Sequence, residues 1–169
     1  AASDVYKRQD EFSRTEGGFN RFNFDVNHVS KLSKVTQFYI FAHGQLANRN
    51  LDSSEQFYLG GADAVRAYPQ GEAGGDSGYQ ATAELRYQTP VKGMSMTLFA
   101  DVGEVLARKD GDTSDPHRRL AGWGIGAVYS LDRSLYARLD YARKIKGESY
   151  RSEAEDKNGR LWFRLYKLF

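Results

Sequence analysis

Two short runs in this chain have spacings that could bind a ligand, and neither run is complete. The alternate glycines from Gly122 to Gly126 are spaced like part of a dinucleotide-binding turn, but no helical pattern follows and the third glycine comes one residue early. The acidic run Asp110 to Asp115 has the composition of a calcium loop, but its central glycine is missing and Ala121 stands where a bidentate glutamate is needed. We interpret the first run as small side chains on a strand and the second as a solvated loop.

Nucleophilic and metal chemistry also lack their usual residues. The chain has no cysteine, which excludes disulfides, thiolate catalysis and thiolate metal sites. Its histidines, His28, His43 and His117, show no metal-ligand spacing, and no arrangement of Ser, His and Asp suggests a hydrolase. We therefore expect a protein that is not an enzyme and that carries no metal and no cofactor.

One long segment, Phe57 to Gly78, combines many glycines with an aliphatic, arginine and aromatic cluster, Val65 to Tyr68. It is too long for a hairpin turn, and loops of this length are usually functional or disordered. A disordered linker would be polar throughout, whereas this segment is rich in apolar side chains. We predict a folded loop that docks on another part of the protein. Arg66 at its centre could form two parallel hydrogen bonds with a carboxylate.

The segment resembles the signature loop of the two-partner secretion transporters of the TpsB type, also called haemolysin secretion/activation proteins. The residues that carry the resemblance are Ser54, Glu55, Gln56, Phe57, Leu59, Gly60, Gly61, Val65, Arg66, Tyr68, Pro69, Gly71, Glu72, Gly75, Asp76 and Gly78. A second family motif, F-x-D-x-G, is present later in the chain as Phe99, Asp101 and Gly103. Two motifs in the right order are far more specific than either alone. The resemblance extends over Phe19 to Phe169, and the wider superfamily often has glycine in place of Ala67.

The resemblance implies how these residues act. In the family this segment is an extracellular loop that folds back into a barrel, where its arginine contacts the aspartate of the second motif. It thus implies an ion pair between Arg66 and Asp101 that holds the loop inside the barrel. Val65 and Tyr68 would pack the loop tip against the barrel wall, and the glycines from Gly122 to Gly126 would leave room for it. The remaining loop glycines would supply positive φ or close backbone approach; they are Gly60, Gly61, Gly74, Gly75 and Gly78.

Composition and periodicity favour an all-β fold. No apolar run approaches the roughly 20 residues of a membrane-spanning helix. Composition alone fits a soluble all-β domain, but it also fits a membrane barrel, whose strands alternate apolar and polar residues. The alternation predicts seven strands: Phe22–Ser30, Thr36–Ala47, Gln80–Gln88, Met94–Val105, Leu120–Tyr129, Ser134–Lys144 and Arg160–Phe169. In the fourth of these, Asp101 lies on the polar face, which in a barrel faces the lumen.

Both ends of the chain carry signals. Phe169, with Phe163 and Leu165 in phase upstream, resembles the C-terminal signal of outer-membrane barrels, although Lys167 breaks the phase. Asp4 to Gln9 resembles the translated end of a transposon used in sequencing, so we expect residues 1–9 to be an adapter artefact. Residues 10–169 would then be the C-terminal portion of a translocator barrel, which has sixteen strands in this family. We expect the earlier strands and the periplasmic POTRA-type domains to be missing, and the fragment to be inactive by itself.

The resemblance implies export of a large haemolysin- or adhesin-type exoprotein across the outer membrane of a Gram-negative bacterium. Expected partners are this TpsA-type exoprotein, the outer-membrane lipid and, during biogenesis, the barrel-assembly machinery. Nucleic acid is not expected, because 24 Lys and Arg are scattered among 22 Asp and Glu. Two alternatives remain at this point. One is a barrel-assembly insertase, which shares the arginine loop; the other is a soluble β-sheet binding domain.

Overall fold

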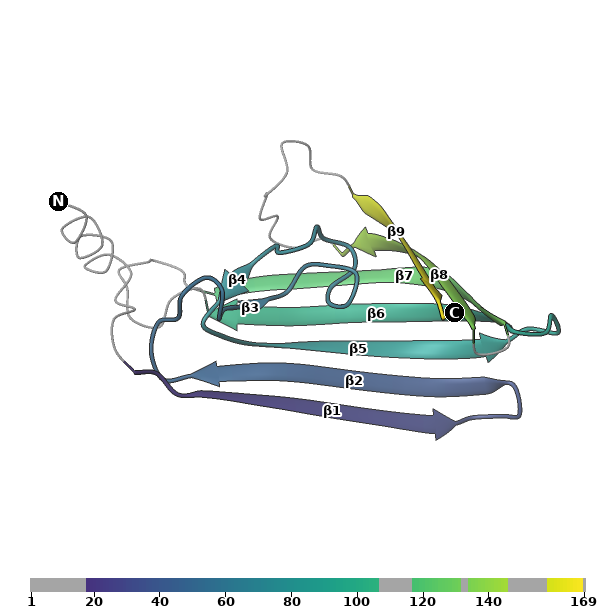
Figure 1. The fold of residues 1–169 in the computed structure, drawn as a ribbon, viewed down its shortest axis with the longest axis horizontal. Helices are drawn as coiled ribbons and strands as arrows, with labels where there is room; N and C mark the ends of the chain where they lie inside the picture. The colour runs from purple at the N-terminus through teal and green to yellow at the C-terminus, as the bar shows by residue number, and fades with distance from the viewer. Residues whose placement is uncertain (1–17, 107–116, 132–133, 146–157, 169) are drawn as a thin grey trace.

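In a computed structural model, which describes residues 18–106, 117–131, 134–145 and 158–168, the chain forms one large antiparallel sheet (Figure 1). The seven strands of the sheet are β1 (Arg21–Lys31), β2 (Thr36–Ala47), β5 (Ser77–Gln88), β6 (Met94–Leu106), β7 (His117–Leu131), β8 (Leu135–Lys144) and β9 (Gly159–Lys167). They lie in the order β1-β2-β5-β6-β7-β8-β9, so that each pairs with the next long strand along the chain. The predicted all-β class and the seven strands are confirmed.

The strands show the alternation that the sequence predicted. In β6, Thr97, Phe99 and Asp101 are buried, whereas Leu98 and Ala100 between them, and Val102 after them, are exposed. Successive side chains of a strand point to opposite faces, so one face of the sheet is covered and the other is open. Cross-strand pairing carries this phase across the sheet, because Asp101 pairs with Gly122 of β7 and both are buried.

Strand ends differ from the predicted ones by a few residues. β5 begins at Ser77 rather than at Gln80, because Ser77 pairs with Leu106 of β6. β7 extends beyond its predicted range at both ends, where the strand partners continue. β9 ends at Lys167, and Phe169 lies outside the described residues. Alternation marks the centre of a strand, whereas hydrogen-bonded neighbours decide how far it extends.

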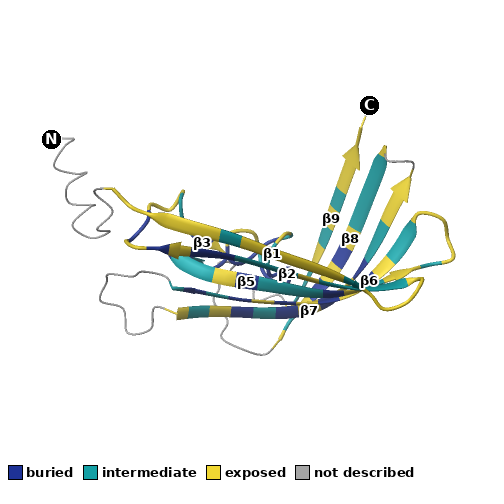
Figure 2. Ribbon diagram, turned by 90° about the horizontal axis from the view of Figure 1, so that it is seen from below, coloured by how far each residue is buried: buried dark blue, intermediate teal, exposed yellow. Residues whose placement is uncertain are grey.

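The sheet is strongly curved. Figure 2 shows β8 and β9 rising at a steep angle from β1 and β2, which gives the sheet a concave and a convex face. The segment between β2 and β5 lies over the concave face and contains a small two-stranded sheet, β3 (Phe57–Tyr58) with β4 (Gly74–Gly75) (Figure 1). The described part of the chain contains no helix of the length and apolarity that crossing a membrane requires.

The convex face is apolar and uncovered. Its large exposed side chains include Leu85, Leu98, Val102, Trp123, Ile125, Leu139, Tyr141, Leu161, Phe163 and Leu165. A continuous apolar surface of this extent marks a membrane or protein contact, and a membrane barrel turns such a face to lipid. Phe163 and Leu165, two residues of the predicted C-terminal signal, therefore lie on the surface that a barrel presents to the membrane.

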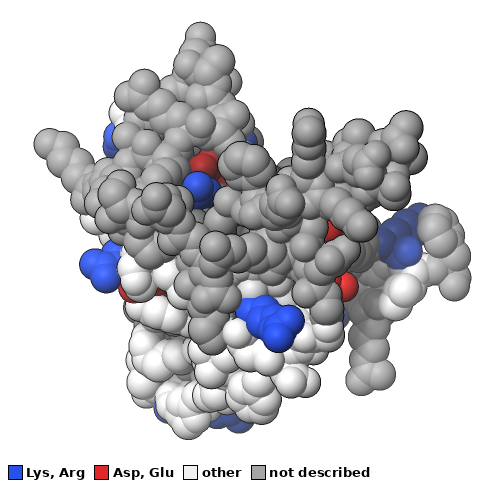
Figure 3. Space-filling model, turned by 90° about the vertical axis from the view of Figure 1, so that its left-hand side faces the viewer, with Lys and Arg blue, Asp and Glu red and all other residues white. Residues whose placement is uncertain are grey.

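Among the described residues that are visible in Figure 3, charged side chains do not gather into one patch. In this view from the left of Figure 1, Lys and Arg and Asp and Glu of the described residues occur at separate places between uncharged areas. The charged residues that do cluster lie on the concave face, beneath the segment between β2 and β5.

Candidate functional site

Within the segment between β2 and β5, residues 59–73 form a compact folded loop between β3 and β4, which we call the docked loop. The N–H groups of Leu59 and Gly60 donate to the carbonyl of Glu72 over 3.2 and 3.0 Å, and the N–H of Val65 donates to the carbonyl of Leu59 over 2.8 Å. Below the loop, Asp76 is fully buried and accepts hydrogen bonds from the Leu51 N–H and the Gln56 amide. These bonds close the loop on itself and fix its base.

Most of the predicted loop glycines are needed because other atoms lie very close. A Cβ at Gly60 would lie 2.3 Å from the carbonyl oxygen of Pro69, and one at Gly75 would lie 2.4 Å from that of Leu106. Gly74 and Gly78 are crowded in the same way by Tyr58 and Val105. Among the five glycines, Gly61 alone has a positive φ, of 142°. Of the two reasons that the sequence suggested for these glycines, close approach of other atoms is therefore more common than a positive φ.

Apolar side chains of the docked loop pack against the sheet. The buried cluster consists of Phe57, Leu59, Val65, Ala67, Tyr68 and Ala73 from the segment and Phe99, Val105, Leu120 and Ala142 from β6, β7 and β8. Gly103 of β6 leaves the space that Leu59 fills, since a Cβ there would lie 2.5 Å from the Leu59 Cδ2. Burial of this apolar surface is favourable, so it contributes to keeping the loop on the concave face.

Arg66 at the tip of the loop binds Asp101 of β6 through three hydrogen bonds. Its Nε donates to Asp101 Oδ2 over 2.9 Å and its Nη2 to Oδ1 over 2.7 Å, while its backbone N–H donates to Oδ2 over 3.2 Å. Thr82 of β5 donates a fourth hydrogen bond to the same carboxylate. Both charged side chains are almost fully buried. The two sequence motifs therefore meet in a bidentate ion pair, the strongest geometry available to these groups.

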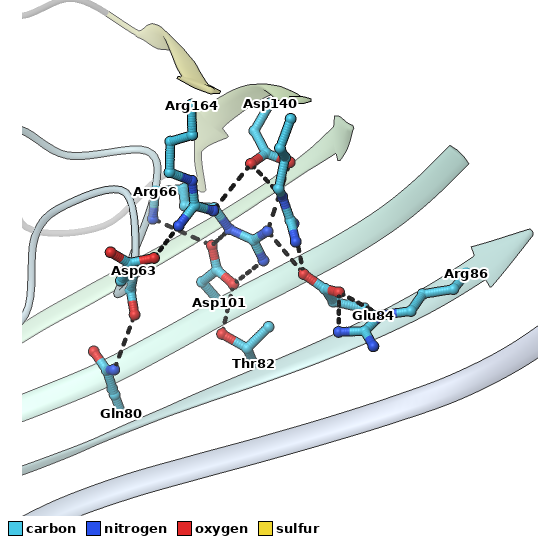
Figure 4. Close-up of polar contacts among 10 residues, drawn as sticks. Asp63, Arg66, Gln80, Thr82, Glu84, Arg86, Asp101, Asp140 and Arg164 are labelled. Carbon is cyan, nitrogen blue, oxygen red and sulfur yellow. Dashed lines mark hydrogen bonds and ion pairs between the residues drawn. The ribbon is translucent and has the colours of Figure 1, made fainter. Parts of the chain in front are cut away.

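Further charges extend this pair into an alternating network (Figure 4). Arg66 Nη1 donates to Glu84 Oε1 over 2.9 Å, and Arg138 Nη2 donates to the same oxygen over 2.8 Å. Arg138 Nε in turn donates to Asp140 Oδ2 over 2.7 Å. Arg86 binds the second oxygen of Glu84. Each of the three carboxylates in this network, Asp101, Glu84 and Asp140, thus has a guanidinium partner, as buried charges require.

Arg66 also lies over an aromatic ring. Its guanidinium carbon is 3.3 Å from the centroid of the Phe99 ring, which places the cation on the negative face of the π-system. Burial opposes the charge and would lower the pKa of Arg66, but the hydrogen bonds and negative charges of Asp101 and Glu84 outweigh burial and raise it. The guanidinium therefore remains charged at any physiological pH.

The glycines of β7 make room for three different groups, which corrects the prediction that all of them accommodate the loop. A Cβ at Gly122 would lie 2.6 Å from the Ala67 Cβ of the loop. One at Gly124 would meet the Phe99 ring, and one at Gly126 would lie close to the Asp140 carboxylate and the Thr97 hydroxyl. Gly122 alone of the three faces the docked loop, because the loop crosses β7 only near that level of the strand.

Several charged or aromatic residues of the site were not assigned to it from the sequence, among them Glu84, Arg138, Asp140, Trp162 and Arg164. The alternation of polar and apolar residues does place them on the concave face, but which partners they contact depends on the curvature of the sheet. Glu84 and Arg138 are 54 residues apart and meet because the sheet bends from β5 to β8. Within the described ranges, no three His, Asp or Glu side chains lie close enough together to hold a metal ion.

Asp101 binds Arg66 of the docked loop directly, whereas Asp140 lies farther from it, and this difference can be tested by substitution. Asp101→Asn removes the charge that receives three hydrogen bonds from Arg66, whereas Arg66 Nη1 is 3.8 Å from Asp140 Oδ1. Hydrogen bonds to charged groups contribute about 1.5–3 kcal/mol each. We expect Asp101→Asn to release the loop at least ten times more often than Asp140→Asn does. Protease sensitivity of the loop in the full-length protein measures this, and equal sensitivity of the two variants would contradict it.

The docked loop leaves a cavity of about 500 Å³ on the concave face. Its lining comes from β1, β2 and β5 on one side and from the loop, β8 and β9 on the other, and includes Tyr39, Phe41, Tyr136, Asp25, Asp63 and Arg86. The lining therefore combines aromatic rings with charges of both signs.

Comparisons with known proteins agree with these features. A family model described as "Haemolysin secretion/activation protein ShlB/FhaC/HecB" matches residues 4–129. Three curated relatives, each named heme/hemopexin transporter protein HuxB and from Haemophilus influenzae, are 34% identical over 88 residues, which is 50% of this chain. A solved structure, CdiB from Acinetobacter baumannii, matches 88% of this chain at a TM-score of 0.66 and 22% identity.

The chain spans 16% of the length of the HuxB relatives and 27% of the CdiB chain, so it corresponds to only a part of each. The structural match shows that this chain shares the fold of part of the CdiB chain. The family match covers both the docked loop with Arg66 and the strand with Asp101. The chain thus belongs to the haemolysin secretion/activation protein family ShlB/FhaC/HecB, whose members are outer-membrane β-barrel transporters.

Proposed function

We propose that the whole protein exports one large exoprotein, of haemolysin or adhesin type, across the outer membrane by two-partner secretion. The observation that carries this proposal is the docking of Arg66 on Asp101 by a loop that lies within the matched family region. Members of the family are transporters rather than enzymes. Because this chain spans a small part of its relatives, the activity is proposed for the complete transporter and not for these strands alone.

The docked loop divides the concave face into a covered and an open part. Many inward-facing residues of β6, β7 and β8 are buried, whereas those of β1 and most of those of β2 are half-buried or exposed; Gln45 and Ala47 at the end of β2 are buried. We propose that the exoprotein passes along the open part, through the cavity beside β1, β2 and β5. Arg66, Asp101, Val65 and Tyr68 would then keep the loop out of this path or set its width.

Three partners follow from this proposal. The exoprotein is the cargo, lipid of the outer membrane contacts the convex apolar face, and the barrel-assembly machinery inserts the barrel. Phe163 and Leu165, together with Phe169, would serve that machinery as the recognition signal. The HuxB relatives are named as heme/hemopexin transporters; we propose an exoprotein cargo here and leave its identity to the experiment below.

The test begins with the complete gene. Sequencing outward on the original DNA should find two POTRA-type domains upstream and a neighbouring gene for a large repetitive exoprotein. Co-expression of both genes in a Gram-negative host should place the exoprotein in the medium, and deletion of the transporter should leave it in the periplasm. Five POTRA-type domains, with defective assembly of other barrels on deletion, would contradict export and indicate an insertase instead.

A further inference from the structure

Strand β9 contacts the docked loop from the side opposite to Asp101. The indole Nε1–H of Trp162 donates a hydrogen bond of 2.7 Å to the backbone carbonyl of Arg66. Two residues later, the Arg164 guanidinium pairs with the Asp63 carboxylate of the loop (Figure 4). Residues that alternate along β9 thus reach the same loop, because side chains two apart on a strand share one face.

These contacts fix both backbone groups of Arg66. Its N–H donates to Asp101 of β6 and its carbonyl accepts from Trp162 of β9. In the sheet, β7 and β8 lie between β6 and β9, so the loop joins two strands that are not neighbours. It can do so because the sheet curves and brings β9 towards the loop (Figure 1).

A second residue links the same elements. Arg164 lies between Asp63 of the loop and Asp140 of β8, whose Oδ2 is 3.7 Å from Arg164 Nη2. The Asp63 side chain is 84% exposed, so water screens its pair with Arg164 and the pair contributes little by itself. The indole hydrogen bond is better shielded, because Trp162 is only partly exposed and its acceptor belongs to a buried residue.

We propose that Trp162 and Arg164 are positioning residues that form a second anchor for the docked loop, in addition to Asp101. The anchor makes the docking of the loop and the position of β9 depend on each other, because a coupling free energy between two sites acts in both directions. The proposal rests on the proposed function only for its effect on export. The anchor itself can be measured without any cargo.

The experiment uses the full-length transporter with Val65→Cys as the one cysteine and follows its rate of maleimide labelling. Val65 belongs to the docked loop and is buried in the cluster that the loop forms with the sheet, so labelling requires the loop to lift. Trp162→Phe replaces the indole with a smaller aromatic ring that has no N–H donor, and we expect labelling to become about three- to tenfold faster. The matched control is Trp123→Phe, because Trp123 lies on the exposed convex face and its replacement should leave the rate unchanged.

The charge pair gives an independent readout. Arg164→Asp should raise the labelling rate about twofold, and the swapped variant Asp63→Arg with Arg164→Asp should bring it back towards that of the parent. Heat-modifiable mobility in gel electrophoresis confirms that each variant contains a folded barrel. If Trp162→Phe does not fold, the charge pair and its swap decide the proposal.

The outcomes separate the anchor from the proposed function. The anchor would be overturned if Trp162→Phe were labelled at the parent rate, even with normal export. If Trp162→Phe does not fold, the same result in Arg164→Asp would overturn it. Faster labelling that is absent from Trp123→Phe supports the anchor, whatever export shows. Reciprocity is tested by hydrogen exchange of the backbone amides of β9, which should be faster in Arg66→Ala than in the parent; equal rates would contradict the dependence of β9 on the loop.

Discussion

Arg66→Ala in the full-length transporter is expected to abolish export of the exoprotein while the barrel still inserts into the outer membrane. The substitution leaves Asp101 and Glu84 buried without the guanidinium that binds both. Removing one partner of a buried ion pair costs about 3–5 kcal/mol, which corresponds to a more than hundredfold loss of the docked loop. Water in the lumen reduces the cost but does not remove it. The sheet survives because its strand pairing does not depend on the loop.

The measurement compares exoprotein in the medium with heat-modifiable mobility of the transporter in outer-membrane fractions. Arg143→Ala is the matched control, because Arg143 is an exposed arginine of β8 that lies outside the network. Arg66→Lys should export at an intermediate level, since an ammonium cannot form the two parallel hydrogen bonds to Asp101. Normal export by Arg66→Ala would show that docking of the loop is not needed for transport.

The centre of this site could be predicted from the sequence, because each half belongs to a motif of its own. Arg66 stands in a long apolar and glycine-rich loop, and Asp101 stands on the polar face of an alternating strand. Alternation also predicted which face of each strand is covered, and β6 follows that phase from Met96 to Val105. Local patterns are sufficient for these features because they depend on side-chain direction within one strand.

The surrounding network could not be predicted in the same way. Glu84 meets Arg138, and Trp162 meets Arg66, only after the sheet has curved and the loop has folded back. Register and curvature depend on all seven strands together, so no single segment contains them. The β7 glycines illustrate the limit: the alternation showed that they face the concave side, but only the assembled sheet shows which group each one accommodates.

Gly122→Val should undock the loop without damage to the sheet, and it is the second large effect that we expect. A Cβ at this position lies 2.6 Å from the Ala67 Cβ, and the two methyl groups of valine extend beyond it. Overpacking of this kind costs about 1–3 kcal/mol, whereas β-branched residues are favourable within strands. The nearest sheet atom, the Arg143 carbonyl oxygen, is 3.2 Å away, so a small shift of that atom accommodates the new side chain.

Combining this substitution with Arg66→Ala tests whether both act through the loop. Once Arg66→Ala has undocked the loop, valine at position 122 no longer meets Ala67, so the double variant should expose the loop no more than the stronger single variant. Additivity would instead be expected of two independent sites. Ala121→Val is the matched control, because it also introduces a valine into β7 but on the opposite face of the strand. It should leave both export and labelling unchanged. An additive double variant, or loss of heat-modifiable mobility in Gly122→Val alone, would place its effect in the strands rather than in the docked loop.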